Sequence, residues 1–149
     1  MSVRPRLIVL VALASLACGG GSHQTPAPQS LTETLAQFLS AVKANDLEQM
    51  GALWGNERGP AKDWMKEEDL RKRVYVIQKY WNHVGYRVVK GPVDVPGSPN
   101  EQTFQVEIQR PTGCNVVLPI DLVRVKSGGW LVHDVHILEA GNPVASCRP

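Results

Sequence analysis

The sequence has almost no net charge, and it contains no apolar run long enough to cross a membrane. Each of these two shortages excludes a class of protein. Its 149 residues suffice for one domain with a core but are too few for a Rossmann or TIM-barrel enzyme. Sixteen Lys and Arg stand against fourteen Asp and Glu, and loss of Arg4 and Arg6 with a leader would leave equal numbers. A protein that binds nucleic acid through phosphate contacts needs a basic excess, so we expect no nucleic-acid partner.

The N-terminus has the pattern of a secretory signal followed by a tether. Residues 1–6 contain two arginines and no acid, and residues 7–17 read LIVLVALASLA. This apolar run is too short for a transmembrane helix, which takes about twenty residues. We therefore predict a signal peptide over residues 1–17. Residues 18–30 are rich in Gly and Pro and have little to bury, which is typical of a flexible tether.

Cys18 follows small residues, and this junction resembles the lipobox of bacterial lipoproteins. In that family the cysteine is acylated and becomes the new N-terminus, so the resemblance implies a palmitate-bearing anchor in the bacterial cell envelope. Gly19 in place of an aspartate favours the periplasmic side of the outer membrane, again by resemblance. Residues 15–17, Ser-Leu-Ala, also suit ordinary signal peptidase, so a secreted chain without lipid stays open as the alternative.

Residues 31–149 are predicted to form one α+β domain that begins with three helices. Ser30 and Glu33 form a capping box that starts the first helix at Leu31. Asn45 and Asp46 interrupt the apolar stripe, and a short helix follows them. A third helix is expected over about residues 63–84, because five apolar residues share one face and Gly85 suits a C-cap: Leu70, Val74, Ile77, Trp81 and Val84.

After Gly85 the apolar period changes to two, which predicts strands over residues 86–95, 103–110, 114–126 and 130–139. A three-residue loop at 111–113 sets the register of one hairpin, with the apolar pairs Ile108–Val116, Val106–Leu118 and Phe104–Ile120. A turn at Gly128-Gly129 would place Leu122 opposite Val135 and Ile120 opposite Ile137. Both hairpins then bury one face, so we predict helices packed on a curved antiparallel sheet.

Two segments of this pattern resemble the NTF2-like superfamily, which includes steroid-isomerase and SnoaL-like proteins. They are AQFLSAVKANDLEQMGALW, a helix pair hinged at Asn45-Asp46, and the terminal SGGWLVHDVHI. The resemblance covers about residues 31–139 and implies a cone whose open end holds a pocket. Some members isomerise or dehydrate small molecules with an Asp or His there, whereas others bind ligands, dimerise or serve as accessory domains.

The predicted register places His133 on the core side, opposite Arg124, where Trp81 and Tyr86 could line a ligand pocket. A small-molecule ligand is therefore possible, and an isomerase or hydrolyase that uses His133 is the alternative. No catalytic residue is assigned, because no core-side acid is expected beside His133. His133 and His136 point to opposite faces of a strand, which argues against a shared metal, and no cofactor is implied.

His136 is expected opposite Asp121 on the outer face, with Asp134 on the same side. This pair fits a solvated cross-strand ion pair better than a couple for proton transfer. The same face would expose Trp130, Val132 and Val125, either as a surface for a homodimer or envelope partner or as a bed for the C-terminal tail.

Cys114 and Cys147 remain once Cys18 is acylated, and outside the cytoplasm they favour a disulfide. A redox role is not expected, because neither lies in a Cys-x-x-Cys motif. The sequence as a whole predicts a lipid-anchored envelope protein that binds or assembles, with no catalytic activity assigned.

Overall fold

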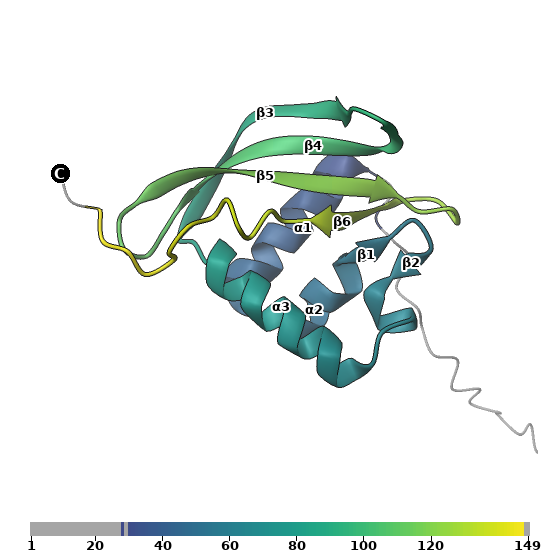
Figure 1. Ribbon diagram of the computed structural model, residues 1–149, viewed down its shortest axis with the longest axis horizontal. Coiled ribbons are helices and arrows are strands. Elements are labelled where there is room, and N and C mark those ends of the chain that lie inside the picture. The colour runs from purple at the N-terminus through teal and green to yellow at the C-terminus, as the bar shows by residue number, and fades with distance from the viewer. Residues whose placement is uncertain (1–27, 29, 148–149) are drawn as a thin grey trace, which may run out of the picture.

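The computed structural model describes residue 28 and residues 30–147, in which three helices cover one face of a four-stranded antiparallel sheet (Figure 1). The arrangement is the α+β class that the sequence predicts. The predicted signal peptide at residues 1–17 and the predicted acylation site at Cys18 lie outside the described residues, as does almost all of the tether.

The first two helices form as their capping residues predict. Helix α1 spans Leu31–Ala44, and the backbone N–H of Glu33 donates to Oγ of Ser30 at 3.1 Å. Helix α2 spans Leu47–Leu53, and the N–H of Gln49 donates to Oδ1 of Asp46 at 2.9 Å. Asn45 joins them in the left-handed region (φ 55°), where its short polar side chain is tolerated better than most. The hinge is therefore specified locally.

The segment between α2 and α3 contains structure that the sequence pattern does not reveal. Two short strands, β1 (Gly55–Asn56) and β2 (Gly59–Pro60), form a hairpin, and a 3-10 turn, η1 (Ala61–Asp63), follows it. Helix α3 spans Glu67–Trp81, so the predicted helix is too long at both ends. Its C-terminus is set by the sheet, because the N–H of Val84 donates to the carbonyl of Gln109 at 2.8 Å.

The sheet has the order β3-β4-β5-β6, with β3 at Gly85–Val95, β4 at Ser98–Gln109, β5 at Asn115–Arg124 and β6 at Trp130–Asp134. The β4–β5 register matches the prediction at all three pairs, Phe104–Ile120, Val106–Leu118 and Ile108–Val116. Five of these side chains are buried against α1–α3 together with Trp81, Phe38 and Met50, and Val116 is partly buried beside them. The space between the helices and the sheet is therefore packed rather than hollow.

The predicted register of the last strand is wrong. Leu122 pairs with Val132 instead of Val135, and β6 ends at Asp134 rather than at residue 139. The β5–β6 turn is centred earlier in the sequence than expected, since the N–H of Val125 already bonds to the carbonyl of Gly129 across it at 3.0 Å. A shift by three residues is odd, so it exchanges the two faces of β6. Val132 thereby enters the core, and His133 leaves it.

The C-terminal tail is fastened to the far end of the sheet. A disulfide joins Cys114 to Cys147, as the cysteine count predicts. Nearby, the buried guanidinium of Arg110 donates to the carbonyl of Asn142 at 3.0 Å and to the carbonyl of Ala140. Burial also lowers the pKa of Arg110 from its ordinary value. These contacts hold the chain that leaves β6 across the end of the β4–β5 hairpin.

Candidate functional site

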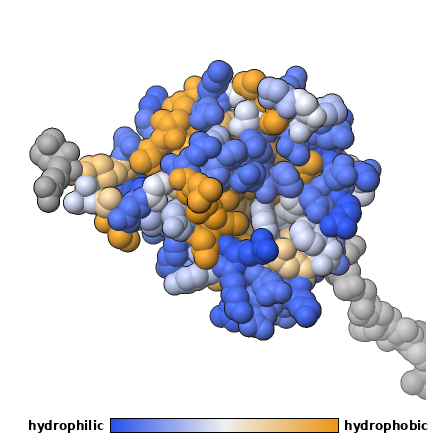
Figure 2. Space-filling view, in the orientation of Figure 1, coloured by the Kyte–Doolittle hydropathy of each residue, from blue (hydrophilic) through white to orange (hydrophobic). Residues whose placement is uncertain are grey.

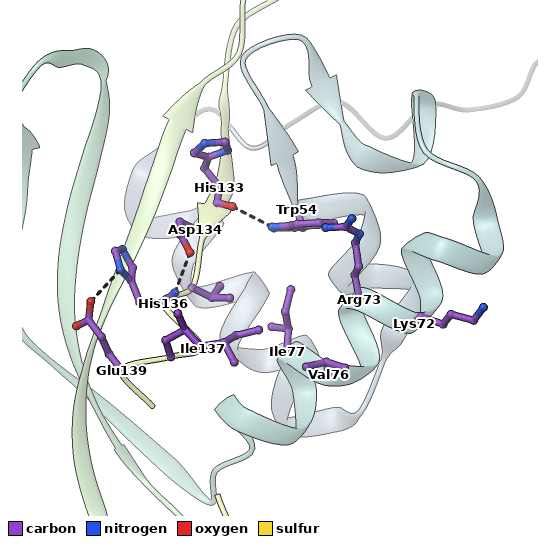
Figure 3. Close-up of a pocket in the computed structure, with 12 residues that line it drawn as sticks. Trp54, Lys72, Arg73, Val76, Ile77, His133, Asp134, His136, Ile137 and Glu139 are labelled. Atoms are coloured by element: carbon purple, nitrogen blue, oxygen red, sulfur yellow. Dashed lines mark hydrogen bonds and ion pairs between the residues drawn. The ribbon is translucent and has the colours of Figure 1, made fainter. Parts of the chain in front are cut away.

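A cleft of about 590 Å³ lies between α3 and the chain that leaves β6 (Figure 3). Helix α3 contributes one wall, Lys72, Arg73, Val76 and Ile77, because these residues lie within two turns of one helix face. The opposite wall is the continuous segment 133–139, and Trp54 from the end of α2 joins the two. The cleft is therefore built from three parts of the chain that are distant in sequence.

The cleft is apolar inside and charged at its margins. Its apolar residues are Val76, Ile77, Val135, Ile137 and Leu138. Leu138 is 99% exposed and Val76 is 43% exposed, so part of this apolar surface meets water. Figure 2 shows apolar side chains open to solvent on this face of the molecule, among hydrophilic ones. A concave apolar surface with a few polar groups is the usual form of a small-molecule site.

Hydrogen bonds from Trp54 and His133 hold the top of the cleft. The indole Nε1 of Trp54 donates to the carbonyl of His133 at 3.0 Å, and Nδ1 of His133 donates to the carbonyl of Gly55 at 2.9 Å. The other ring nitrogen of His133, Nε2, lies 3.8 Å from Oε1 of Glu101 on β4. These bonds fasten the end of β6 to the β1–β2 hairpin.

His136 forms the centre of an acidic cluster on the second wall. Its Nε2 lies 2.8 Å from Oδ2 of Asp121 and its Nδ1 lies 3.2 Å from Oε1 of Glu139, while its backbone N–H donates to Asp134 at 2.9 Å. Burial by itself lowers the pKa of His136, but the hydrogen bond to Asp121 and the charges of Asp121, Asp134 and Glu139 outweigh it. The net result is a raised pKa.

Among the described residues that line the cleft, Arg73 on α3 is the only basic side chain without an ion-pair partner. The acids of the second wall are engaged by His136, and Lys72 pairs with Glu68 at 2.6 Å. Arg73 forms no ion pair with any described residue and lines the cleft. Its guanidinium is thus available for a carboxylate, sulfonate or phosphate.

The structure does not bring the four predicted pocket residues together. Only His133 lies at a cleft. Trp81 is fully buried and donates through Nε1 to the carbonyl of Val135 at 2.7 Å, while Tyr86 packs edge-on against His83. Arg124 is exposed and lies over the ring of Trp130 at 5.5 Å. The expected pocket between them is wrong, because the shifted β6 register turns His133 away from a cone that core side chains already fill.

The prediction that Trp130, Val132 and Val125 form an exposed patch on the sheet is also wrong. Val132 is 0% exposed and Val125 is 3% exposed, and Trp130 is half-buried against the core. Val125 belongs to a small second cluster with Val123 and Leu131, and Gly55 of the β1–β2 hairpin packs against Leu131. The unexpected hairpin therefore contributes to covering the side of the sheet on which the prediction left an open surface.

The pairing of His136 with Asp121 was expected, but its setting was not. His136 lies beyond β6, in a positive-φ conformation (φ 44°) that folds its ring back toward β5. The pair is partly buried at the margin of the cleft instead of being fully solvated on a strand. Sequence reasoning missed Trp54, Arg73 and Glu139, because none of them stands in a pattern that marks a functional residue.

The described residues contain no group of three or more His, Cys, Asp or Glu arranged to hold a metal ion. Among the described helices, none combines the length and hydropathy needed to span a membrane.

No protein-family model matches the sequence, and no curated protein matches it. Among solved structures, the chain is similar to a protein from Campylobacter jejuni described as an NTF2-like transpeptidase. The TM-score is 0.50 at 12% sequence identity, and the match covers 70% of this chain and 99% of that chain. The likeness shows the fold: residues of this chain form a small α+β domain with an NTF2-like fold, as the resemblance implies.

Proposed function

We propose that the chain is a lipid-anchored cell-envelope protein whose NTF2-like domain binds a small acidic molecule with an apolar body. The observation that carries the proposal is the cleft between α3 and residues 133–139, with an apolar interior and the guanidinium of Arg73, which pairs with no acid among the described residues. The anchor is supported by the apolar leader and Cys18, and by the tether that follows.

The charge distribution favours an anion over a cation. Carboxylates would attract a cationic ligand, but Asp121 and Glu139 both already contact the ring of His136, whose positive charge offsets one of their two negative charges. Arg73 has no such partner among the described residues. An organic acid could place its apolar part against Val76 and Ile137 and its acidic group beside Arg73.

The binding test uses 8-anilino-1-naphthalenesulfonate as a fluorescent probe, with decanoate and decanol as competitors of similar length. Decanoate is expected to displace the probe more effectively than decanol, and Arg73→Gln should remove that preference. Arg71→Gln, two residues away on α3 but lining a different groove, is the matched control and should keep it. Equal displacement by acid and alcohol in the wild type would contradict the proposal.

A second variant tests the location. Val76 is partly exposed and lines the cleft, so Val76→Trp should fill the cleft without entering the core. Probe binding should fall while the melting temperature stays within a few degrees. Unchanged probe binding in this variant would place the ligand elsewhere.

The anchor is tested separately by intact mass spectrometry of the protein processed in a bacterial host. The proposal expects a chain that begins at Cys18 and carries acyl groups, and Cys18→Ala should lose them. A wild-type chain of unmodified mass would refute the anchor without touching the cleft.

A further inference from the structure

Pro28, which belongs to the predicted tether, lies at one end of the sheet. The backbone N–H of Trp130 donates to the carbonyl of Pro28 at 2.9 Å, and Thr34 of α1 donates to the carbonyl of Trp130 at 3.2 Å. The chain is therefore held beside the start of β6. Cys18 precedes Pro28 by ten residues, which can span at most about 35 Å.

The same end of the molecule joins the β5–β6 turn to the β1–β2 hairpin (Figure 1). The backbone N–H of Lys126 donates to the carbonyl of Glu57 at 2.9 Å, and the side chains of the two residues pair at 3.5 Å. Arg58, next along the hairpin, places its guanidinium 5.3 Å from the centre of the Trp64 ring. A continuous series of contacts thus leads from Pro28 to Trp64.

Trp64 remains open to solvent, and the segment around it exposes both cations and the acids Glu57, Asp63 and Glu67. Trp64 is 42% exposed although its Nε1 is already bonded to the carbonyl of Gly59 at 3.2 Å. Exposed lysines, Lys62 and Lys66, flank it two residues away on each side. We call the exposed residues Arg58, Lys62, Trp64, Lys66 and Lys126 the tether-end surface. Tryptophan with nearby Lys and Arg is typical of protein surfaces at the boundary between water and anionic lipid.

We infer that the tether-end surface rests on anionic phospholipid headgroups, with Trp64 at the level of the headgroups. The inference rests on the proposed lipid anchor, because an acyl group within about 35 Å of Pro28 keeps this end near the bilayer. The anchor supplies the proximity, and the lysines with Trp64 supply the orientation. The cleft between α3 and residues 133–139 uses different residues, so ligand access and membrane contact do not compete for the same side chains.

The first experiment measures vesicle binding by a protein that cannot carry the acyl anchor. The mature chain from residue 18, produced without the predicted leader and carrying Cys18→Ala, is mixed with vesicles of phosphatidylcholine, with or without phosphatidylglycerol, and sedimented at low and high salt. Binding is expected only with phosphatidylglycerol and should weaken as salt is added. Lys62→Gln with Lys66→Gln should weaken it by about twenty-five-fold, since each lysine near an anionic surface contributes about fivefold.

The matched control neutralises two lysines elsewhere, Lys79 on α3 and Lys90 on β3, by the same change to Gln. Both are exposed and neither lies at the tether end. The control should bind as tightly as the parent. Equal losses in both double variants would mean that only total charge matters, and absence of any binding would mean that this surface has no affinity for lipid. Either result overturns the inference.

The second experiment uses the acylated wild-type chain in vesicles that contain brominated lipids, which quench tryptophan on contact. The quenched fraction should be larger in the wild type than in Trp64→Phe, since Trp54, Trp81 and Trp130 are half-buried or buried. Equal quenching in the two proteins overturns the inference. So does a dimer in size-exclusion chromatography that Trp64→Phe abolishes, because a second copy would then cover the surface. A mass spectrum without acyl groups refutes the anchor alone, and the sedimentation result stands independently.

Discussion

His136 lies between two carboxylates, with Nε2 2.8 Å from Asp121 and Nδ1 3.2 Å from Glu139. Ionised carboxylates only accept hydrogen bonds, so both ring nitrogens must carry a proton for both contacts to form. The arrangement thus selects the imidazolium and links the chain after β6 to strand β5.

This relationship predicts a pH-dependent contribution to stability. Because the pKa of His136 is raised in the folded protein, its contribution is fully present below the unfolded pKa of about 6.5 and is lost as pH rises through the folded value. His136→Asn, which tolerates the positive φ, should cost about 1 to 2 kcal/mol near pH 5.5 and less at alkaline pH.

Urea unfolding of the wild type and His136→Asn across this pH range measures the difference. The two proteins must be compared because His83 also changes its pKa on folding. Burial lowers the pKa of His83, the nearby Lys43 lowers it further, and the backbone bond to Trp81 opposes both effects. His83 therefore gives a pH dependence of opposite sign in both proteins. A gap between the two proteins that stays constant with pH would show that His136 is neutral in the fold.

Two neighbouring residues of β5 test the buried face of the sheet. Leu118 is 1% exposed and Val117 is 50% exposed. Leu118→Ala should cost about 3 kcal/mol, because it removes buried methyl groups and leaves a cavity. Val117→Ala should change the free energy of unfolding by about 0.5 kcal/mol or less. Comparable losses in the two variants would argue against the β4–β5 register.

The Cys114–Cys147 disulfide closes a loop of 33 residues in sequence separation. Replacement of both cysteines by Ala should lower the free energy of unfolding by about 2 to 4 kcal/mol, because the unfolded chain gains freedom. Denaturation with and without a reductant measures this loss. The double variant should be insensitive to the reductant; if the wild type is equally insensitive, the two thiols are not joined in solution.

A substitution at Gly55 tests the packing of the β1–β2 hairpin, which the sequence pattern did not predict. A Cβ at this position would meet the carbonyl of Gly59, lie 3.0 Å from Cα of Pro60 and lie 2.9 Å from Leu131. Gly55→Ala should therefore cost about 1 to 3 kcal/mol in thermal or urea unfolding. Gly85→Ala is the control, since its nearest contact is a flexible Gln109 side chain at 3.8 Å. A fully stable Gly55→Ala would mean that the hairpin does not pack here.

Part of the candidate site could be read from the sequence, and part could not. His133, and the coupling of His136 to Asp121, were identified from residue types and strand spacing, although the face assigned to His133 was wrong. Arg73 and Trp54 gave no pattern of their own, because a charged residue on a helix and a tryptophan at a helix end are common in structural roles. Their place in a candidate site is recognised only because the segment 133–139 packs opposite them and forms a cleft.

The sequence by itself determined the elements that depend on near neighbours. The caps at Ser30 and Asp46, the hinge at Asn45 and the β4–β5 pairing all follow from contacts within a few residues or across a short loop. Only the tertiary structure decided the register of β6, the end of α3 and the cleft between them. These depend on bonds such as Trp54 to His133 and Trp81 to Val135, which join residues more than fifty positions apart and have no local signature.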